Sequence, residues 1–326
     1  MSQKESSNTS NWLQRLVGEY GDSPSAQRAT PADTAVLRLP AGCALATSID
    51  TLVCGVHFPA ETAPADIGHK ALAVNLSDLA AMGAEPSTAL LSLSAPAIDG
   101  PWLNQFAHGF KALAGRYKVR LLGGTLNDGP LAVTVAVYGH LPSHHALRRD
   151  NAAIGDRIFV TGALGDAGLA RAVAGGEIPT APQDRHRHYL EVRLSRPEPR
   201  IAVGVALRNL ASSAIDVSDG LLADLSHVLT ASHVGAIIDL TRLPLSEAMM
   251  SCTGLNEARH LALSAGDDYE LCFTVPPDNL ARLEIIRADL DCPIQQIGEI
   301  VRACGLRCFD EAGSWPATRL GYQHFT

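Results

Sequence analysis

The stretch "SAIDVSDGLLADLSHV", residues 213–228, places the carboxylates of Asp216, Asp219 and Asp224 within nine positions. The apolar residues around them are typical of a buried strand that runs into a buried helix. Unpaired carboxylates are costly in such a place. At a strand-to-helix junction, backbone N–H groups can hold an anion, and Ser218 can present its hydroxyl there. The stretch therefore indicates a site for charged ligands.

Further acids stand at similar places. Asp33 lies at the front of a strand, and Asp50 lies near the end of another. Asn75 and Asp78, at i and i+3, share one face of an apolar helix. Each alone is explained as a turn, surface or capping residue, and Asp219 before Gly-Leu-Leu-Ala would open a helix well. If the acids converge, however, their mutual repulsion demands cations.

The donor types indicate which cation. Oxygen ligands without a His/Cys cluster suit Mg²⁺ or Mn²⁺, and Mg²⁺ usually shares its coordination shell with substrate phosphates. The seven cysteines are scattered, odd in number and form no CxxC pair, so we expect them to be reduced and structural. The pattern predicts a metal-phosphate site.

The elements that must position these residues follow from periodicity and turn residues. The first half predicts strands over 34–40, 43–53, 87–96, 119–124 and 131–141, a loop over 123–130, and helices over 65–86 and 101–118. A polar, irregular stretch, 142–156, predicts a boundary between domains 1–148 and 149–326. The second half predicts strands over 157–162 and 235–240, a helix from about Asp166, and a loop into a strand over 265–275.

Strands and helices mix without strict βαβ regularity, which favours two α+β domains over a doubly wound sheet. No GxGxxG follows a first strand and no GxxxxGK[ST] is present, so neither a Rossmann nor a P-loop site is predicted.

Composition narrows the function classes. Of 326 residues, 46% are hydrophobic and 18% are charged, which suits a compact globular protein. A net charge of −8 disfavours a nucleic-acid partner or an anionic membrane surface. No apolar run approaches the roughly 20 residues of a membrane helix, and the polar residues 1–10 do not form a signal peptide. We expect a cytoplasmic protein with neither membrane nor nucleic acid as a partner.

Five stretches together resemble the thiamine-monophosphate kinase family, within the superfamily of aminoimidazole ribonucleotide synthetase and selenophosphate synthetase. They are "SIDTLVCGVHF", "HKALAVNLSDLAAMGAEP", "SAIDVSDGLLADL", "GDDYELCFTV" and "GYQHF". The resemblance runs in order from about residue 12 to 325. It implies an N-terminal sheet that pairs in a homodimer, and ATP with several Mg²⁺ ions between the domains. The implied reaction transfers the γ-phosphoryl group of ATP to thiamine phosphate by direct in-line attack.

The resemblance also implies residue roles. Mg²⁺ would be bound by six residues: Asp33, Ser48, Asp50, Asp78, Asp216 and Asp219. ATP would be contacted by Gly123, Gly124, Arg149 and Ser218. Thiamine phosphate would be contacted by His57 and Asp267, and Tyr322 would stack on the thiamine ring. Without the resemblance, His57 would be a core or edge histidine and Tyr322 a packing residue.

The chain departs from the family pattern near the expected ATP phosphates. Ala32 stands where the first acid of the usual "GDD" is expected, and Thr125 stands where "GGDT" has a metal-binding aspartate. Asp267 is one methylene shorter than the usual glutamate, and Ile49 replaces the usual Thr or Val. Arg149 is retained, but the residues beside it differ from the family pattern. Removing a preorganised electrostatic contact can cost about 10²–10³-fold in rate.

Three functions stay open at this point. The first is an active thiamine-monophosphate kinase, which the retained acids favour. The second is a divergent paralogue with little catalysis that binds a nucleotide or thiamine phosphate, which Ala32 and Thr125 favour. The third is a superfamily enzyme with another phosphate acceptor, although neither the reactive N-terminal Cys/Lys of selenophosphate synthetases nor a C-terminal cysteine tail is present.

Overall fold

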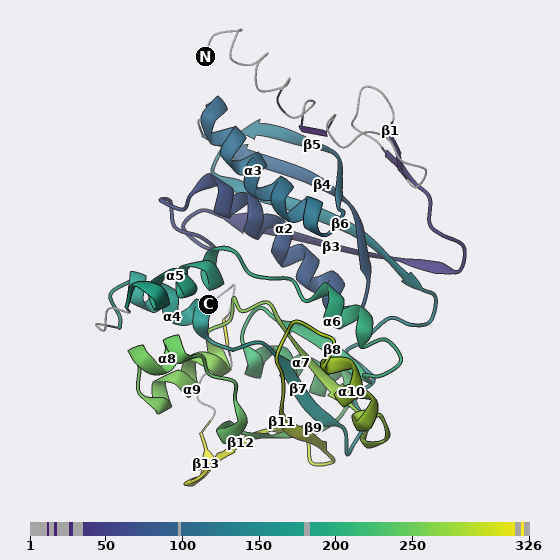
Figure 1. The fold of residues 1–326 in the computed structure, drawn as a ribbon, viewed down its shortest axis with the longest axis vertical. Coiled ribbons are helices and arrows are strands. Elements are labelled where there is room, and N and C mark those ends of the chain that lie inside the picture. The colour runs from purple at the N-terminus through teal and green to yellow at the C-terminus, as the bar shows by residue number, and fades with distance from the viewer. Residues whose placement is uncertain are drawn as a thin grey trace. The chain divides into compact units, whose positions relative to one another are not determined.

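A computed structural model describes residues 12, 16–17, 26–28, 35–96, 99–178, 183–316 and 321–322. The chain divides into two compact units. The first consists of Met1–Leu79 and Ala84–His144, and the second of Ala80–Gly83 and His145–Thr326. Each unit combines helices with its own sheet, which confirms the predicted α+β class (Figure 1).

The first unit is built on a four-stranded sheet in the order β3 (Cys43–Val53), β6 (Ala132–Pro142), β4 (Glu85–Ala95), β5 (Arg120–Asp128). Neighbouring strands are antiparallel except β4 and β5, which are parallel. Helices α2 (Pro64–Ala81) and α3 (Gly100–Arg116) lie over one face of this sheet (Figure 1). A separate two-stranded sheet pairs β1 (Ala26–Arg28) with β2 (Ala35–Leu37).

The covered face of the sheet is fully apolar at its centre. Val133, Val135 and Val137 of β6 are completely buried. Two glycines let α2 and α3 approach closely over this face. A Cβ on Gly68 would lie 2.2 Å from the carbonyl oxygen of Phe106, and a Cβ on Gly109 would lie 1.8 Å from that of Ala65. The helices therefore touch through their backbones, which draws α2 tightly into the core.

The opposite face of the sheet carries a row of hydroxyl groups across all four strands. Thr51 and Thr134 share a hydrogen bond of 2.8 Å, and Thr125 donates to Ser92 over 3.0 Å. Cross-strand pairing of Ser92 with Thr134 joins the two halves of the row. Ile49 is also on this face and is 65% exposed. This side of the sheet, called the open face below, mixes hydroxyl and apolar groups.

The predicted loop over 123–130 is wrong for most of its length. Strand β5 continues to Asp128, because its residues pair in register with β4 from Leu90–Gly123 to Ala95–Asp128. Three glycines, three polar residues and a proline gave the stretch a loop-like composition. The neighbouring strand supplies the hydrogen bonds that local propensity cannot predict.

The second unit contains a seven-stranded sheet in the order β13, β12, β9, β11, β7, β10, β8. Only the β12–β9 pair is parallel. The strands are β7 (Arg157–Thr161), β8 (Ser213–Val217), β9 (Gly235–Asp239), β10 (Glu270–Val275), β11 (Ile294–Val301), β12 (Gly305–Asp310) and β13 (Gly313–Trp315). The α-helices are α4 (Asp166–Ala174), α5 (Asp184–Ser195), α6 (Ile201–Ala206), α7 (Leu221–Ser232), α8 (Glu247–Cys252), α9 (Leu255–Ser264) and α10 (Leu280–Arg287). Short 3₁₀ helices are η1 (Leu240–Arg242) and η2 (Pro277–Asn279).

The core of this unit lies between the sheet and α7. Ile215 and Val217 of β8 cluster there with Leu221, Leu225 and Val228 of the helix. The apolar residues that flank the three acids of "SAIDVSDGLLAD" therefore anchor a strand and a helix to each other. The polar residues between them are left in the connecting turn.

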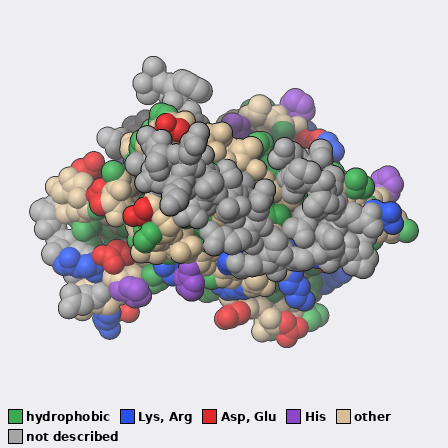
Figure 2. All heavy atoms as spheres, turned by 90° about the horizontal axis from the view of Figure 1, so that it is seen from above, with side chains coloured by type: hydrophobic (Ala, Val, Ile, Leu, Met, Phe, Trp, Pro, Cys, Tyr) green, Lys and Arg blue, Asp and Glu red, His purple; other side chains and the backbone are tan. Residues whose placement is uncertain are grey.

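None of the described helices is both long and apolar enough to cross a membrane. On the face shown in Figure 2, the acidic and basic side chains of the described residues are interspersed rather than gathered by sign.

Candidate active site

The first unit brings together candidate metal ligands from a strand and a helix. Ser48 and Asp50 alternate on β3 and lie opposite Val137 and Val135, so both project toward the helix-covered face. The Ser48 hydroxyl donates to the carboxylate of Asp78 on α2. Residues thirty positions apart are thus in direct contact, and each supplies an oxygen donor.

His57 lies in the turn that follows β3 and is partly buried. Its ring Nδ1 accepts the backbone N–H of Val53 over 3.0 Å. The backbone N–H of His57 donates to the Val53 carbonyl over 2.9 Å. Because Nδ1 is an acceptor, the neutral ring carries its proton on Nε2. The turn therefore orients His57 as a hydrogen-bond donor.

Gly123 and Gly124 lie on β5, at the sheet edge opposite β3. Three strand spacings of roughly 4.8 Å separate them from Ser48 and Asp50, which is about 14 Å. A Cβ on Gly124 would lie 1.9 Å from the Leu91 carbonyl oxygen, so this glycine permits the close pairing of β5 with β4. Thr125 lies on the open face, on the other side of the sheet from Asp50. Within one unit, these residues do not join the Ser48–Asp78 group.

The turn between β8 and α7 is organised by Asp224. One oxygen of its carboxylate accepts the backbone N–H groups of Ser218, Asp219 and Gly220, over 2.9, 3.0 and 3.1 Å. The N–H groups that were predicted to hold an anion therefore hold one from the chain itself. This corrects the expectation that they are available to a ligand.

The same contacts remove the capping explanation for Asp219. Gly220 is the N-cap of α7 and makes no side-chain capping bond, while Asp224 in the first turn satisfies the N–H groups instead. Asp219 is partly buried, and Asp216 is 4% exposed on β8. Neither acid is required to begin the helix.

The charge of Asp224 is disfavoured in this place. Burial, followed by the nearby carboxylate of Asp219, raises the pKa of Asp224 to about 7, against the lowering effect of the three N–H donors. A second ionised carboxylate beside Asp219 is costly because few solvent dipoles reach it.

Two further predicted residues lie against this turn. The N–H of Asp267 donates to the Ser218 carbonyl over 2.7 Å, and the N–H of Tyr322 donates to the Asp219 carbonyl over 2.9 Å. Position 266 requires glycine, because a Cβ there would lie only 2.5 Å from the Ser218 carbonyl oxygen. Segments from three parts of the chain thus meet at one turn, with Tyr322 45% exposed.

Arg149 does not join them within this unit. Its carbonyl accepts the hydroxyl of Ser232 over 2.8 Å, at the last residue of α7, and the neighbouring Arg148 carbonyl accepts Ala214 N–H over 3.2 Å, near the start of β8. The turn with Ser218 and Asp219 lies at the other end of both elements. A twelve-residue helix spans roughly 18 Å, so Arg149 could reach a ligand at the turn only if that ligand were extended.

Asp33 lies outside the described residues. Within the described ranges, no group of three or more His, Cys, Asp and Glu side chains could hold a metal ion by itself. The candidate acids are divided between the two units, with Asp50 and Asp78 in the first and Asp216 and Asp219 in the second.

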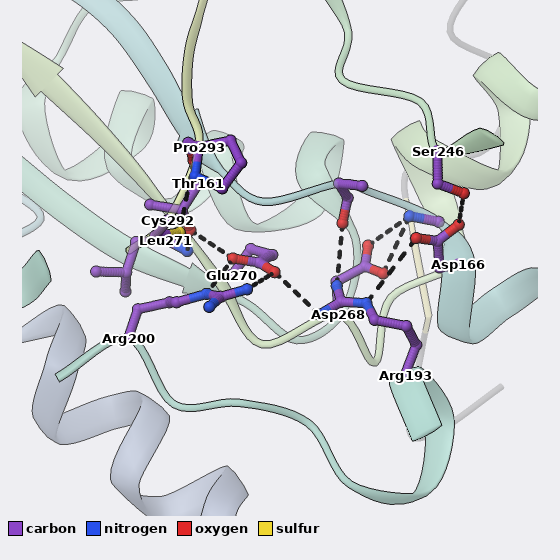
Figure 3. Close-up of polar contacts among 12 residues, drawn as sticks. Thr161, Asp166, Arg193, Arg200, Ser246, Asp268, Glu270, Leu271, Cys292 and Pro293 are labelled. Atoms are coloured by element: carbon purple, nitrogen blue, oxygen red, sulfur yellow. Dashed lines mark hydrogen bonds and ion pairs between the residues drawn. The ribbon is translucent and has the colours of Figure 1, made fainter. Parts of the chain in front are cut away.

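Sequence reasoning missed a buried ionic cluster around Glu270, close to Asp268 (Figure 3). Glu270 accepts two bonds from Arg200, both of 2.6 Å, lies 3.0 Å from Arg193 and accepts the Thr161 hydroxyl over 2.6 Å. Burial opposes its ionisation, yet Arg200 and Arg193 hold the pKa of Glu270 below its ordinary value. "GDDYEL" was a signal for this cluster, since two further acids follow Asp267, one just before a mostly apolar strand and one at its first residue.

Family models match most of the chain. Residues 31–141 match the N-terminal domain of AIR synthase related proteins, and residues 153–311 match the C-terminal domain of the same proteins.

Individual relatives agree. The chain is 46% identical to the thiamine-monophosphate kinase of Salmonella typhimurium over 90% of each chain. It is similar to the crystal structure of thiamine-monophosphate kinase from Stenotrophomonas maltophilia K279a, at 43% identity and a TM-score of 0.85, over 90% of this chain and 94% of the other. A structure of AaThiL complexed with AMPPCP and TMP matches at 27% identity and a TM-score of 0.77, over 96% of each chain.

Proposed function

This chain belongs to the thiamine-monophosphate kinase family of AIR synthase related proteins, and we propose that it transfers the γ-phosphoryl group of ATP to thiamine phosphate. The products are ADP and thiamine diphosphate. The observation that carries the proposal is the meeting of Ser218, Asp219, Asp267 and Tyr322 at the turn that follows Asp216 on β8. The complex of AaThiL with AMPPCP and TMP supports a nucleotide and a phosphate acceptor as its ligands.

The residues fit Mg²⁺ as the accompanying ion. Ser48, Asp50 and Asp78 would hold it in the first unit, together with Asp33, and Asp216 and Asp219 would hold it in the second. All the donors are carboxylate or hydroxyl oxygens, which Mg²⁺ prefers, and the contact between Ser48 and Asp78 shows that two of them already share one place. When bound, Mg²⁺ neutralises charge on the β- and γ-phosphates.

The side chains bind and orient rather than react. An oxygen of the thiamine phosphate group attacks the γ-phosphorus in line, the bond to the β-phosphate oxygen breaks, and ADP leaves with that electron pair. Ser218 would donate to a nucleotide phosphate, and His57 would donate from Nε2 to the acceptor phosphate. Asp267 would contact the acceptor, and Tyr322, which is exposed, would stack on the thiamine ring. Positioning and electrostatic stabilisation together supply most of the rate in such reactions.

A coupled assay of ADP formation tests this function. We expect turnover that depends on thiamine phosphate and stops when Mg²⁺ is removed by a chelator. Thiamine and hydroxymethylpyrimidine phosphate, offered in its place, test whether another acceptor is preferred.

The alternative of a binding protein with little catalysis is favoured by one observation. Thr125, where the family pattern has an acid, has its hydroxyl engaged with Ser92 on the open face. If thiamine phosphate and ATP bind in calorimetry while the coupled assay gives no turnover, this alternative replaces the kinase.

We also infer that the protein acts as a homodimer through the open face. Leu45 and Ile49 are 46% and 65% exposed there, on edge strand β3. Gly123 and Gly124 lie at the opposite edge of the same sheet, about 14 Å from Asp50, so only an extended ligand could contact both in one protomer. A second copy packed against the open face would cover these apolar side chains. Sedimentation of the purified protein measures its mass in solution, and a monomer that turns over at full rate would refute the inference.

A further inference from the structure

The turn that presents Asp267 is held in an uncommon backbone conformation. Gly266, Asp267 and Tyr269 have φ angles of 70°, 67° and 52°. Residues other than glycine rarely adopt such φ angles, and these angles persist only where surrounding contacts determine them. The contacts that fix this turn therefore decide where the Asp267 carboxylate lies.

One set of contacts comes from the end of β8. Asp267 and Tyr269 donate their N–H groups to the carbonyls of Ser218 and Val217, over 2.7 and 2.8 Å. These two bonds hold the backbone of the turn against the site. They flank Asp268, whose side chain makes the second set of contacts.

Asp268 is 1% exposed and binds the start of α4. Both of its carboxylate oxygens accept the N–H of Gly165, over 3.0 and 2.8 Å. Gly165 is the N-cap of α4 and has no side chain to cap the helix, so Asp268 supplies the cap from another part of the chain. Burial raises the pKa of Asp268 well above its ordinary value, against the charge of Arg193 and the Gly165 bond.

Helix α4 returns a contact to the turn. Arg171 of this helix donates to the Ala265 carbonyl over 2.9 Å, and its guanidinium lies 3.7 Å from the carboxylate of Asp267. The position of α4 thus sets the partner of Asp267. The helix is in turn connected to the ionic cluster, because Asp166 in its first turn lies 3.9 Å from Arg193. Asp166 also accepts the hydroxyl of Ser246 over 2.5 Å (Figure 3).

We propose that Asp268 is a positioning residue for the acceptor side of the site: by capping α4 against the Gly266–Tyr269 turn, it fixes Asp267 and its partner Arg171. The proposal rests on the proposed function, because it concerns where Asp267 meets thiamine phosphate. Asp268 itself touches no substrate and acts through Asp267. The cluster of Arg193, Arg200 and Glu270 fixes the first residue of β10, which follows the Gly266–Tyr269 turn in the chain.

Steady-state kinetics test the role. Asp268→Ala is expected to raise the KM for thiamine phosphate about tenfold while the KM for ATP stays within about twofold, since a small misplacement of a positioning group can cost up to about 10²-fold. Asp268→Asn keeps an oxygen that can accept the Gly165 N–H, and it is expected to restore most of the affinity. In an Asp267→Ala background, Asp268→Ala should add less than about twofold, because a group that acts through another loses its effect when that group is removed.

Asp156 offers a matched control. It is 2% exposed, and it accepts the Ala153 N–H over 2.9 Å and the hydroxyl of Ser212. Asp156→Ala is expected to lower the Tm without separating the two KM values. If Asp268→Ala raised both KM values equally, or added its full effect to Asp267→Ala, the proposal would be overturned.

Hydrogen exchange separates this proposal from the proposed function. The Asp267 and Tyr269 amides should exchange faster in Asp268→Ala than in the wild-type protein or in Asp156→Ala. Unchanged exchange overturns the positioning role whatever the activity. If these amides exchanged faster in Asp268→Ala but the wild-type protein did not phosphorylate thiamine phosphate, the proposed function would fail while the hold of Asp268 on the turn stood.

Discussion

Removing the Asp224 carboxylate tests how the turn between β8 and α7 is built. Asp224→Ala deprives the N–H groups of Ser218, Asp219 and Gly220 of their common acceptor. The Gly220 N–H is buried, so leaving it without an acceptor would cost about 1–3 kcal/mol of stability. The other two N–H groups are partly exposed and can form hydrogen bonds with water instead. Removal of the disfavoured Asp224 charge offsets part of this loss, so we expect the free energy of unfolding to fall by about 1–2 kcal/mol. Asp224→Asn keeps one carbonyl acceptor and should lose about 1 kcal/mol.

Urea denaturation measures the free energy of unfolding, and ATP titration at fixed Mg²⁺ measures the function of the turn. Because Ser218 and Asp219 lie in the turn that Asp224 holds, we expect the KM for ATP to rise about tenfold or more in Asp224→Ala. Asp239 provides the control. Its carboxylate caps η1 by accepting the N–H and hydroxyl of Thr241 over 3.0 and 2.6 Å. Asp239→Ala should lose about 1 kcal/mol and leave the KM for ATP unchanged.

The opposite result is equally informative. If Asp224→Ala bound ATP as tightly as, or more tightly than, the wild-type protein, the three N–H groups would be serving the nucleotide once the carboxylate was gone. The turn would then be an anion site that Asp224 merely occupies. The account of Asp224 as its organiser would be wrong.

The remaining predictions concern the first unit. Asp78→Asn should lower kcat about 10²–10³-fold, whereas Asp66→Asn at the start of the same helix should not; full activity in Asp78→Asn would refute its metal role. Ile49→Asp should shift the sedimenting species to a monomer, while Ile285→Asp, at an isoleucine 70% exposed on α10, should not. Gly124→Ala should cost about 1–3 kcal/mol in urea denaturation, because its Cβ would lie 1.9 Å from the Leu91 carbonyl oxygen. Gly115→Ala, with nothing within 4 Å, should be neutral or stabilising, and a stable Gly124→Ala would contradict the described pairing of β5.

Local sequence determined much of the scaffold. Alternation on β3 placed Ser48 and Asp50 on one side of the strand, and the apolar residues of α2 predicted its burial. The flanks of Asp216 and Asp219 predicted a strand that runs into a helix, and β8 and α7 confirm it. These features follow from neighbours one to four residues apart, which the pleat of a strand and the pitch of a helix bring to one face.

Only the tertiary structure decided which partner each polar group has. The amides of the β8–α7 turn could have held a phosphate by their sequence, yet the fold gives them Asp224. Thr125 could have turned toward Asp50, yet the pairing of β5 with β4 places it beside Ser92 on the open face. Asp268 and Gly165 are 103 residues apart, and the order of strands in the sheet alone brings them together. Sequence spacing reports the geometry within an element, whereas hydrogen bonds between elements depend on long-range pairing that no local pattern encodes.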